Sequence, residues 1–236
     1  MAKLTRLQIV TAGMLQGQRD DLASVLNEWF NVWLRKEYAA WPWTFLKRKK
    51  SAFALASGIT SLAVGAGSGS VTEEIQKILD PILIYNSDYS VKQRARIKQL
   101  TGGGVDFDEI INNPTTTIGV PSQFKVRADE STWGKWNLIP YPIPDRALLL
   151  TFDYIVQPAD IDTSTAGDAS VPLYPSDRTM IQSVLVETLR YSNGADSADY
   201  QQALDLLGGY TIDDRVKYGQ VPGDNDLIQL DSSVFR

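Results

Sequence analysis

Residues 20–43 read DDLASVLNEWFNVWLRKEYAAWPW, and this stretch decides how the chain is organised. Its apolar residues recur at helical spacing, at Leu22, Val25, Leu26, Trp29 and Trp33, which predicts a helix over about 20–40. The acidic pair Asp20-Asp21 complements the positive end of the helix dipole, and Pro42 disfavours helix for the residue before it. We therefore expect a long helix that ends at an aromatic exit, Trp41-Pro42-Trp43.

Further helices are expected on both sides of this one. Residues 4–15 carry apolar side chains at helical spacing. Near the other end, Ser176 caps a helix that ends at Asn193-Gly194. Ser197 opens another helix, which Gly208-Gly209 weaken or break and which could resume as far as Tyr218.

Between residues 51 and 160 the pattern changes to short strands and turns. The clearest strands are residues 53–55, 59–64, 72–79, 82–85, 122–127, 135–139 and 147–157. The last is almost wholly apolar, which is typical of a central strand covered on both faces. Residues 91–100 fit a strand or a short helix, and Asp106–Ile110 carries a capping-box pattern that predicts a short helix.

The order helices, strands, helices predicts an α+β fold. The N- and C-terminal helices, residues 1–50 and 175–219, form a helical bundle domain. A mostly antiparallel β-domain, residues 51–174, is inserted between them, and residues 220–236 form an extended C-terminal tail.

The composition excludes several kinds of chemistry. The chain has 236 residues with no histidine and no cysteine, so a disulfide, a Cys/His zinc site, a thiolate nucleophile and a histidine base are impossible. Gly102-Gly103-Gly104 lacks the following Lys-Ser/Thr of a phosphate-binding loop. The acidic groups at 106–109 and 224–226 lack the EF-hand spacing. We predict no catalytic residue, cofactor or metal ligand, although sequence alone leaves a facing acid pair open among 28 acids.

Neither a membrane span nor a secretion signal is expected. No stretch of about 20 apolar residues exists, and Met1-Ala2-Lys3 does not lead into the apolar region of a signal peptide. We expect a soluble protein made in the cytoplasm.

Charge is distributed unevenly. Residues 1–50 carry nine bases and four acids, although the whole chain has a net charge of -5. Such a split suits copies that pack side by side, or it reflects ordinary solvated faces. The basic run Lys47-Arg48-Lys49-Lys50 is predicted to be a solvated turn, with binding to nucleic acid or to an acidic partner as the alternative.

Tryptophan is concentrated in the opening stretch. Four of the six tryptophans are Trp29, Trp33, Trp41 and Trp43. They either form a hydrophobic plug over the helix pair or anchor a subunit interface, where tryptophan is over-represented. We take these four as candidate subunit-interface residues.

Three short motifs follow one another along the chain after residue 118. Gly119-Val120-Pro121 opens a strand, Pro142-Ile143-Pro144-Asp145 forms a turn, and Tyr154 precedes Pro158 at a strand end. A capped helix follows near Pro175-Ser176-Asp177. In this order the chain resembles the head-to-tail adaptor (connector) proteins of tailed bacteriophages, especially the tail-tubular or nozzle-adaptor type of short-tailed phages. The helix with its W-x-W exit fits the same organisation.

The resemblance implies a virion structural protein, not an enzyme. It implies a ring, commonly of twelve copies, in the virion neck between the portal protein and a tail nozzle or tube protein. The helices at 4–40 and 176–218 would pack with neighbouring copies, and the strands at 51–160 would meet the tail. Double-stranded DNA would pass through the lumen without sequence readout. Residues 220–236 would reach the portal through Leu227, Ile228, Leu230, Val234 and Phe235.

Other functions remain open at this point. One is a different neck or tail structural protein, such as a stopper or tube subunit, which would be mostly β. Another is a tail-associated glycan-degrading enzyme. A third is a DNA-packaging accessory that uses the four bases at 47–50.

Overall fold

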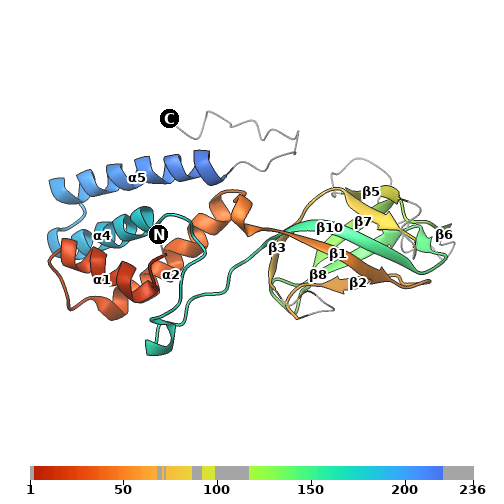
Figure 1. Ribbon diagram of the computed structural model, residues 1–236, viewed down its shortest axis with the longest axis horizontal. Helices are drawn as coiled ribbons and strands as arrows, with labels where there is room; N and C mark the ends of the chain where they lie inside the picture. Colours follow the sequence, from red (N-terminus) through yellow and green to blue (C-terminus); the bar gives the residue numbers. More distant parts are fainter. Residues whose placement is uncertain (1–2, 68–70, 72, 87–91, 99–116, 220–236) are drawn as a thin grey trace. The chain divides into compact units, whose positions relative to one another are not determined.

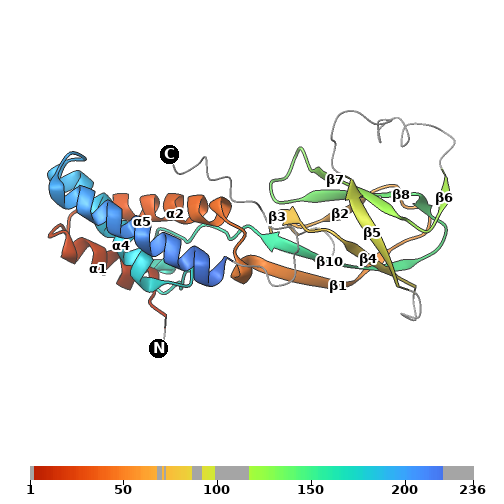
Figure 2. The same cartoon turned by 90° about the horizontal axis from the view of Figure 1, so that it is seen from above.

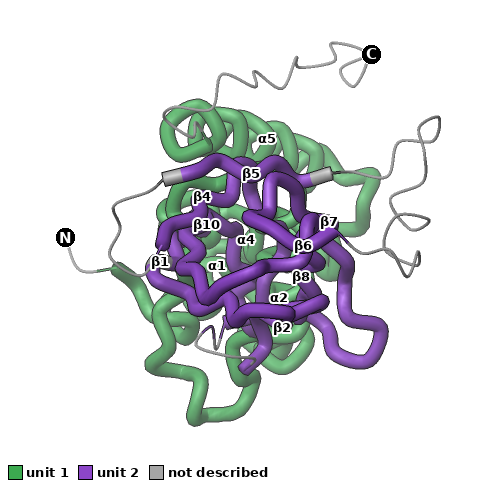
Figure 3. Tube along the Cα trace, turned by 90° about the vertical axis from the view of Figure 1, so that its right-hand side faces the viewer, with its two compact units in different colours: residues 1–45, 160–236 green, residues 46–159 purple. Residues whose placement is uncertain are grey.

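The computed structural model describes residues 3–67, 71, 73–86, 92–98 and 117–219. The chain divides into two compact units, drawn in different colours in Figure 3. Unit 1 consists of residues 1–45 and 160–236, and unit 2 of residues 46–159. The second unit is therefore inserted between two segments of the first. The α+β class is confirmed, with helices in unit 1 and strands in unit 2.

The units change at 45/46 and 159/160, whereas the sequence placed these boundaries at 50/51 and 174/175. Residues 47–50 begin strand β1 (Lys47–Leu55), which pairs with β10 (Leu148–Val156), so the prediction of a solvated turn there is wrong. Beyond β10, the chain attaches to unit 1. The Asn31 side chain exchanges two hydrogen bonds with the backbone of Ile161 at 2.7 and 3.1 Å.

Unit 1 contains four α-helices among its described residues. They are α1 (Arg6–Gln16), α2 (Ala23–Ala40), α4 (Asp177–Asn193) and α5 (Ala198–Tyr218). Short 3-10 helices span Thr44–Leu46 and Thr165–Gly167. Helix α4 packs against each of the other three. In Figure 1, α5 lies on one side of α4, and α1 and α2 lie on the other.

Local signals in the sequence explain where three of these helices begin. Thr5 and Gln8 form a reciprocal capping box at the start of α1. The hydroxyl groups of Ser176 and Ser197 accept hydrogen bonds from the first turns of α4 and α5, as predicted. Helix α5 runs through Gly208-Gly209 without a break, which corrects the expectation of an interruption there.

Helix α1 approaches α4 closely because α1 carries glycine at the contact. A Cβ atom placed on Gly13 would lie 2.6 Å from the Cβ of Val184, closer than real side chains come. One turn later, a Cβ on Gly17 would clash with Thr188. The spacing Gly13-x-x-x-Gly17 therefore lets the two helix backbones lie side by side.

The core of unit 1 is aromatic. Tyr174 is fully buried, and its ring centroid lies 5.3 Å from that of Trp33 and 5.4 Å from that of Trp43. Both pairs meet edge to face, a favourable arrangement for aromatic rings. The Trp43 indole also donates a 2.7 Å hydrogen bond to the carbonyl of Glu37. These contacts join the end of α2 to the segment that precedes α4.

Unit 2 is a large, mostly antiparallel sheet that curls on itself (Figure 2). Its remaining strands are β2 (Leu62–Val64), β3 (Ile75–Ile78), β4 (Ile82–Tyr85), β5 (Lys92–Lys98), β6 (Ile118–Gly119), β7 (Gln123–Ala128), β8 (Trp136–Tyr141) and β9 (Ile143–Pro144). The order in this sheet is β1-β10-β4-β5-β7-β8-β2, with β3 also paired to β10, while β6 and β9 form a separate two-stranded sheet. Among the described pairs, β5–β7 and β6–β9 are parallel and the rest antiparallel.

Strand β10 holds this sheet together. It pairs with β1, β3 and β4, and most of its side chains are buried, as its apolar sequence predicted. The ambiguous residues 91–100 contain strand β5. The short helix expected at Asp106–Ile110 lies outside the described residues. Within the part of the chain that the structure describes, no helix is both long enough and apolar enough to cross a membrane.

Candidate interaction surfaces

Exposed apolar side chains gather on the helical unit. Of the thirteen large apolar side chains that are exposed among the described residues, only Ile118 and Trp133 belong to unit 2. The other eleven are on unit 1: Leu7, Leu15, Val25, Val32, Val171, Leu173, Tyr191, Leu204, Leu206, Ile212 and Val216. Single exposed apolar residues are ordinary, so what matters is whether they line up along one helix face.

Four residues of α5 form such a line. Leu204, Gly208, Ile212 and Val216 are spaced four residues apart, so they lie above one another on one face, here called the α5 row. Ile212 is 53% exposed and Val216 is 69% exposed. Above Gly208 the space is open, since no atom of the described chain lies within 4 Å of a Cβ placed there. The row is flanked by the exposed carboxylates of Asp205 and Asp213.

A second line runs along α2. Val25, Trp29, Val32 and Lys36 follow helical spacing on the side away from the core, here called the α2 row. Val32 is 53% exposed, Val25 is also exposed, and Trp29 is half-buried. Lys36 is exposed and supplies a positive charge to this face.

The four candidate tryptophans fall into two groups. Trp33 and Trp43 are buried in the core of unit 1 against Tyr174, so they belong to the hydrophobic plug. Trp29 and Trp41 keep part of their surface exposed. Trp41 packs against Gly219, and the guanidinium of Arg215 lies 5.8 Å from its ring centroid. Trp29 and Trp33 are four residues apart on one helix face, so spacing alone could not separate them, and the aliphatic α5 row carries no aromatic signal.

Ionised groups buried in unit 1 have structural partners. Arg6 is 1% exposed and donates to the carboxylate of Asp168 and, at 2.8 Å, to the carbonyl of Ser164. Glu37 lies 3.3 Å from Arg215, and Asp214 accepts a 2.5 Å hydrogen bond from Thr179. Burial raises the pKa of Tyr174, and the nearby carboxylates of Asp214 and Glu37 raise it further. These contacts connect helices and loops of unit 1, so the groups have a structural role.

Among the described residues of unit 2, Trp133 is the most exposed large apolar side chain, at 80%. It lies in the turn between β7 and β8, where the carboxylate of Asp129 organises the backbone. That carboxylate accepts hydrogen bonds from the Ser131 hydroxyl at 2.6 Å and from the Ser131 and Thr132 amides at 3.0 Å. The bonds from Ser131 lower the pKa of Asp129 to about 2. These hydrogen bonds therefore order the turn that presents the exposed indole of Trp133.

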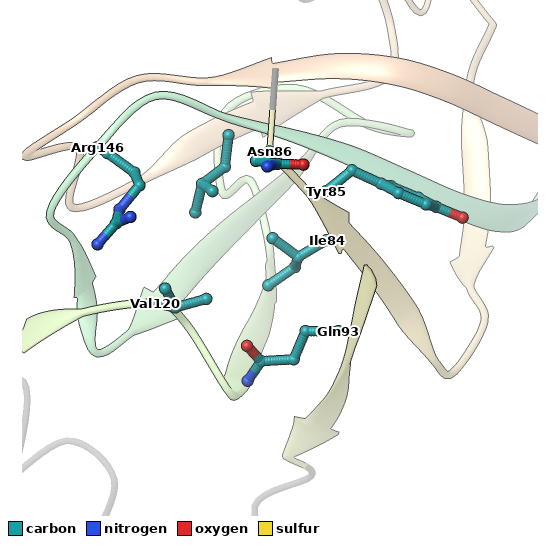
Figure 4. Close-up of a pocket in the computed structure, with 7 residues that line it drawn as sticks. Ile84, Tyr85, Asn86, Gln93, Val120 and Arg146 are labelled. Atoms are coloured by element: carbon teal, nitrogen blue, oxygen red, sulfur yellow. The ribbon is translucent and has the colours of Figure 1, made fainter. Parts of the chain in front are cut away.

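Unit 2 also has a small cavity of about 100 Å³ (Figure 4). Apolar walls come from Ile84, Val120 and Leu148, and Gln93 and Arg146 add polar groups. The Arg146 guanidinium is held by Asp145 at 2.7 Å. Small-molecule sites usually measure about 300–1,000 Å³, so this cavity is too small for a substrate of ordinary size.

The basic run at 47–50 is partly neutralised by acids of the same sheet. The Lys47 ammonium lies 3.0 Å from the carboxylate of Asp153, and the Arg48 guanidinium lies 3.8 Å from that of Glu73. Both acids are far away in sequence, so their approach was not visible locally. Of the four bases only Lys49 is exposed, which weakens the interpretation as a DNA-binding patch.

The candidate portal-interface residues lie outside the described residues: Leu227, Ile228, Leu230, Val234 and Phe235. Within the described ranges, no group of three or more acidic side chains is placed to hold a metal ion. No protein-family model matches the chain, and no curated protein matches it either.

Proposed function

We propose that the chain is a virion structural protein, a head-to-tail adaptor that forms a ring between the portal and the tail of a tailed bacteriophage. The observation that carries this proposal is the pair of uncovered apolar helix faces, the α5 row and the α2 row. A subunit of a ring needs two different faces, one for each neighbour. Helices α5 and α2 offer two such faces: the ion pair between Arg215 and Glu37 joins the two helices, and each row lies on an exposed side of its own helix.

The motifs that carry the resemblance support the adaptor assignment in particular. Gly119-Val120-Pro121 and Pro142-Ile143-Pro144-Asp145 meet in space, because β6 and β9 pair with Gly119 opposite Pro144. The Asp145 amide also donates to the Gly119 carbonyl at 3.3 Å. Tyr154 and Pro158 follow along and beyond β10. Two of the three motifs therefore lie side by side in unit 2 although they are more than 20 residues apart in the sequence.

In the proposed assembly, commonly of twelve copies, each part of the chain has its own partner. The helices of unit 1 contact neighbouring copies, the strands of unit 2 contact the tail nozzle or tube protein, and residues 220–236 reach the portal. Double-stranded DNA passes through the lumen. The substantial helical unit favours an adaptor over a stopper or tube subunit, which would be mostly β.

The direct test is assembly with the portal protein of the same phage. The full chain, alone and mixed with purified portal, would be examined by native mass spectrometry and negative-stain electron microscopy. We expect a ring of adaptor copies on the portal ring. A chain that stays a single copy under both conditions, or a purified virion neck without it, would overturn the proposal.

A shortened chain tests the part assigned to residues 220–236. A variant that ends at Gly219 should keep the circular dichroism spectrum and melting temperature of the full chain but lose attachment to the portal. The matched control replaces Leu227, Ile228 and Leu230 with serine in the full chain, which keeps the length and removes the apolar contacts. Attachment that survives both changes would show that another region binds the portal.

A further inference from the structure

We infer that the α5 row of one copy packs against the α2 row of the next copy. This inference rests on the proposed function for the closure of the ring, and it adds the pair of surfaces that meet. Both rows are exposed in the single chain, and each presents apolar side chains along one face of a long helix.

The glycine of the α5 row points to a helix as the occupant. Glycine in a helix interior is less stable than alanine. The contact with α4 explains the glycine at position 13. At Gly208 no other part of the described chain lies within 4 Å of a Cβ placed there, and the backbone is ordinary helix. Because position 208 carries no side chain, the surface between Leu204 and Ile212 lets the ridge of a neighbouring helix approach closely.

Charge selects α2 as the opposite face. Asp205 and Asp213 beside the α5 row are exposed and have no partner among the described residues. If α5 packed against α5 of another copy, these carboxylates would face each other. The α2 row instead carries one exposed base, Lys36, beside one exposed acid, Glu28, so the charges along it balance where those along the α5 row would repel.

The same charges disfavour the end of this chain as the occupant. Residues 220–236 follow α5 directly and are long enough to return along it, but they carry Asp224, Asp226 and Asp231 against the single base Arg236. These acids would lie beside Asp205 and Asp213. A second copy is therefore the better-matched occupant.

A contact of this kind generates an assembly instead of a closed pair. The two rows are different surfaces on different helices, so joining the α5 row of one copy to the α2 row of another leaves a free row at each end of a dimer. Repetition of such a head-to-tail contact gives a ring when the rotation closes and a filament when it does not.

Cross-linking tests this pairing, because the natural chain contains no cysteine. Ile212→Cys and Val32→Cys would be made as two single variants and treated with a short bismaleimide. We expect a covalent dimer when the two variants are mixed and little product from either alone. The double variant should give a ladder of products that ends at the ring. Leu15→Cys on α1, which is 68% exposed, replaces Val32→Cys in the control mixture and should give no dimer.

The outcomes separate this inference from the proposed function. A portal-bound ring without the 32–212 cross-link would overturn the inference and leave the function standing. A strong cross-link in a chain that forms only filaments and does not bind the portal would support the inference and overturn the proposed function. Dimers of Ile212→Cys with itself would show that α5 meets α5. If deletion of residues 220–236 made maleimide label the Ile212→Cys variant faster in a single copy, that segment would cover the row instead.

A substitution in the α5 row gives an independent measurement. Ile212→Asp should weaken self-association at least tenfold in analytical ultracentrifugation, because it places a charge in an apolar contact next to Asp213. Leu15→Asp is the matched control on α1 and should leave association unchanged. Equal behaviour of the two variants, with unchanged circular dichroism spectra, would overturn the inference.

Discussion

The two units of this chain differ in how completely they cover their own apolar surface. Unit 2 leaves two large apolar side chains exposed among its described residues, and unit 1 leaves eleven. Their charges also differ: in the full sequence, unit 1 has ten bases and seventeen acids, and unit 2 has thirteen bases and eleven acids. An acidic helical unit with uncovered apolar rows is typical of a part that is completed by assembly.

The interiors differ as well, and this difference leads to the predictions. Unit 1 buries ionised groups, including Arg6, Glu37 and Asp214, each with a specific partner. Unit 2 buries one charged side chain among its described residues, Lys125, and around β10 it stacks apolar side chains such as Leu150, Ile84 and Phe53. We therefore expect the replacement of one buried polar or charged residue to lower the stability of unit 1 more than that of unit 2.

The largest effect is expected for Asp168→Ala. The change leaves the Arg6 guanidinium buried without its carboxylate, and two of its nitrogens, Nε and Nη1, already lack a partner within the described structure. Breaking a fully buried ion pair costs about 3–5 kcal/mol, and because the Asp168 carboxylate is 32% exposed the loss here falls at the lower end of that range. Hydrogen exchange with mass spectrometry, which follows each unit separately, should show the loss in unit 1.

The exposed pair Arg19–Asp21 provides the control for this prediction. Its carboxylate lies 2.6 Å from the guanidinium, but both side chains face solvent. Asp21→Ala should therefore change the stability far less than Asp168→Ala. Equal losses from the two variants, or a loss confined to unit 2, would contradict the comparison between the units.

A smaller effect is expected for Gly13→Val in α1. The new side chain would collide with Val184 of α4 and force the two helices apart, at a cost of about 1–3 kcal/mol.

Gly209→Ala in α5 is the opposite case, because no other part of the described chain lies near a Cβ placed there. This substitution should stabilise the helix by about 0.5–1 kcal/mol. Urea unfolding followed by circular dichroism measures both. Destabilisation by Gly209→Ala would show that something covers this face.

The fold class and most elements could be predicted because their signals are local. Capping residues gave the starts of α4 and α5, and the apolar run at 147–157 gave the central strand. The strand at 47–50 could not be predicted, because it depends on pairing with β10 and on the distant acids Asp153 and Glu73. Residues 160–174 belong to unit 1 for a similar reason, through contacts with Asn31 and Arg6.

The candidate surfaces were less predictable than the fold. A tryptophan in an amphipathic stretch can lie in the core or at its edge, and only packing separates Trp33 from Trp29. Helix α5 looked interrupted at Gly208-Gly209, so its continuous row was not visible in the sequence. Trp133 gave no periodic signal at all, because its exposure depends on the turn built around Asp129.

In unit 2, Tyr154→Phe should cost roughly 1 kcal/mol, since it removes a 2.7 Å hydrogen bond from the Tyr154 hydroxyl to Glu73. Burial, and then Glu73, raises the pKa of Tyr154 to about 12 from a usual value of 10. The neutral phenol therefore contributes stability that is present below pH 10 and is lost as pH rises through 12. Hydrogen exchange of the β3 and β10 peptides should show this loss in the natural chain but not in the variant. If the variant lost stability at alkaline pH as the natural chain does, groups other than Tyr154 would be responsible for that loss.

The smallest effect concerns the turn that presents Trp133. The hydrogen bonds from Ser131 lower the pKa of Asp129 to about 2, whereas an unfolded aspartate titrates near 3.8. The contribution of Asp129 to stability is therefore present above pH 3.8 and is lost as pH falls toward 2. Asp129→Asn should remove this part of the acid response and loosen the turn, because an amide accepts hydrogen bonds less strongly than a carboxylate. A carboxyl-carbon NMR titration with a midpoint near 4 for Asp129 would contradict this prediction. It would also show that the hydrogen bonds from Ser131 hold the turn that presents Trp133 less firmly than their short distances indicate.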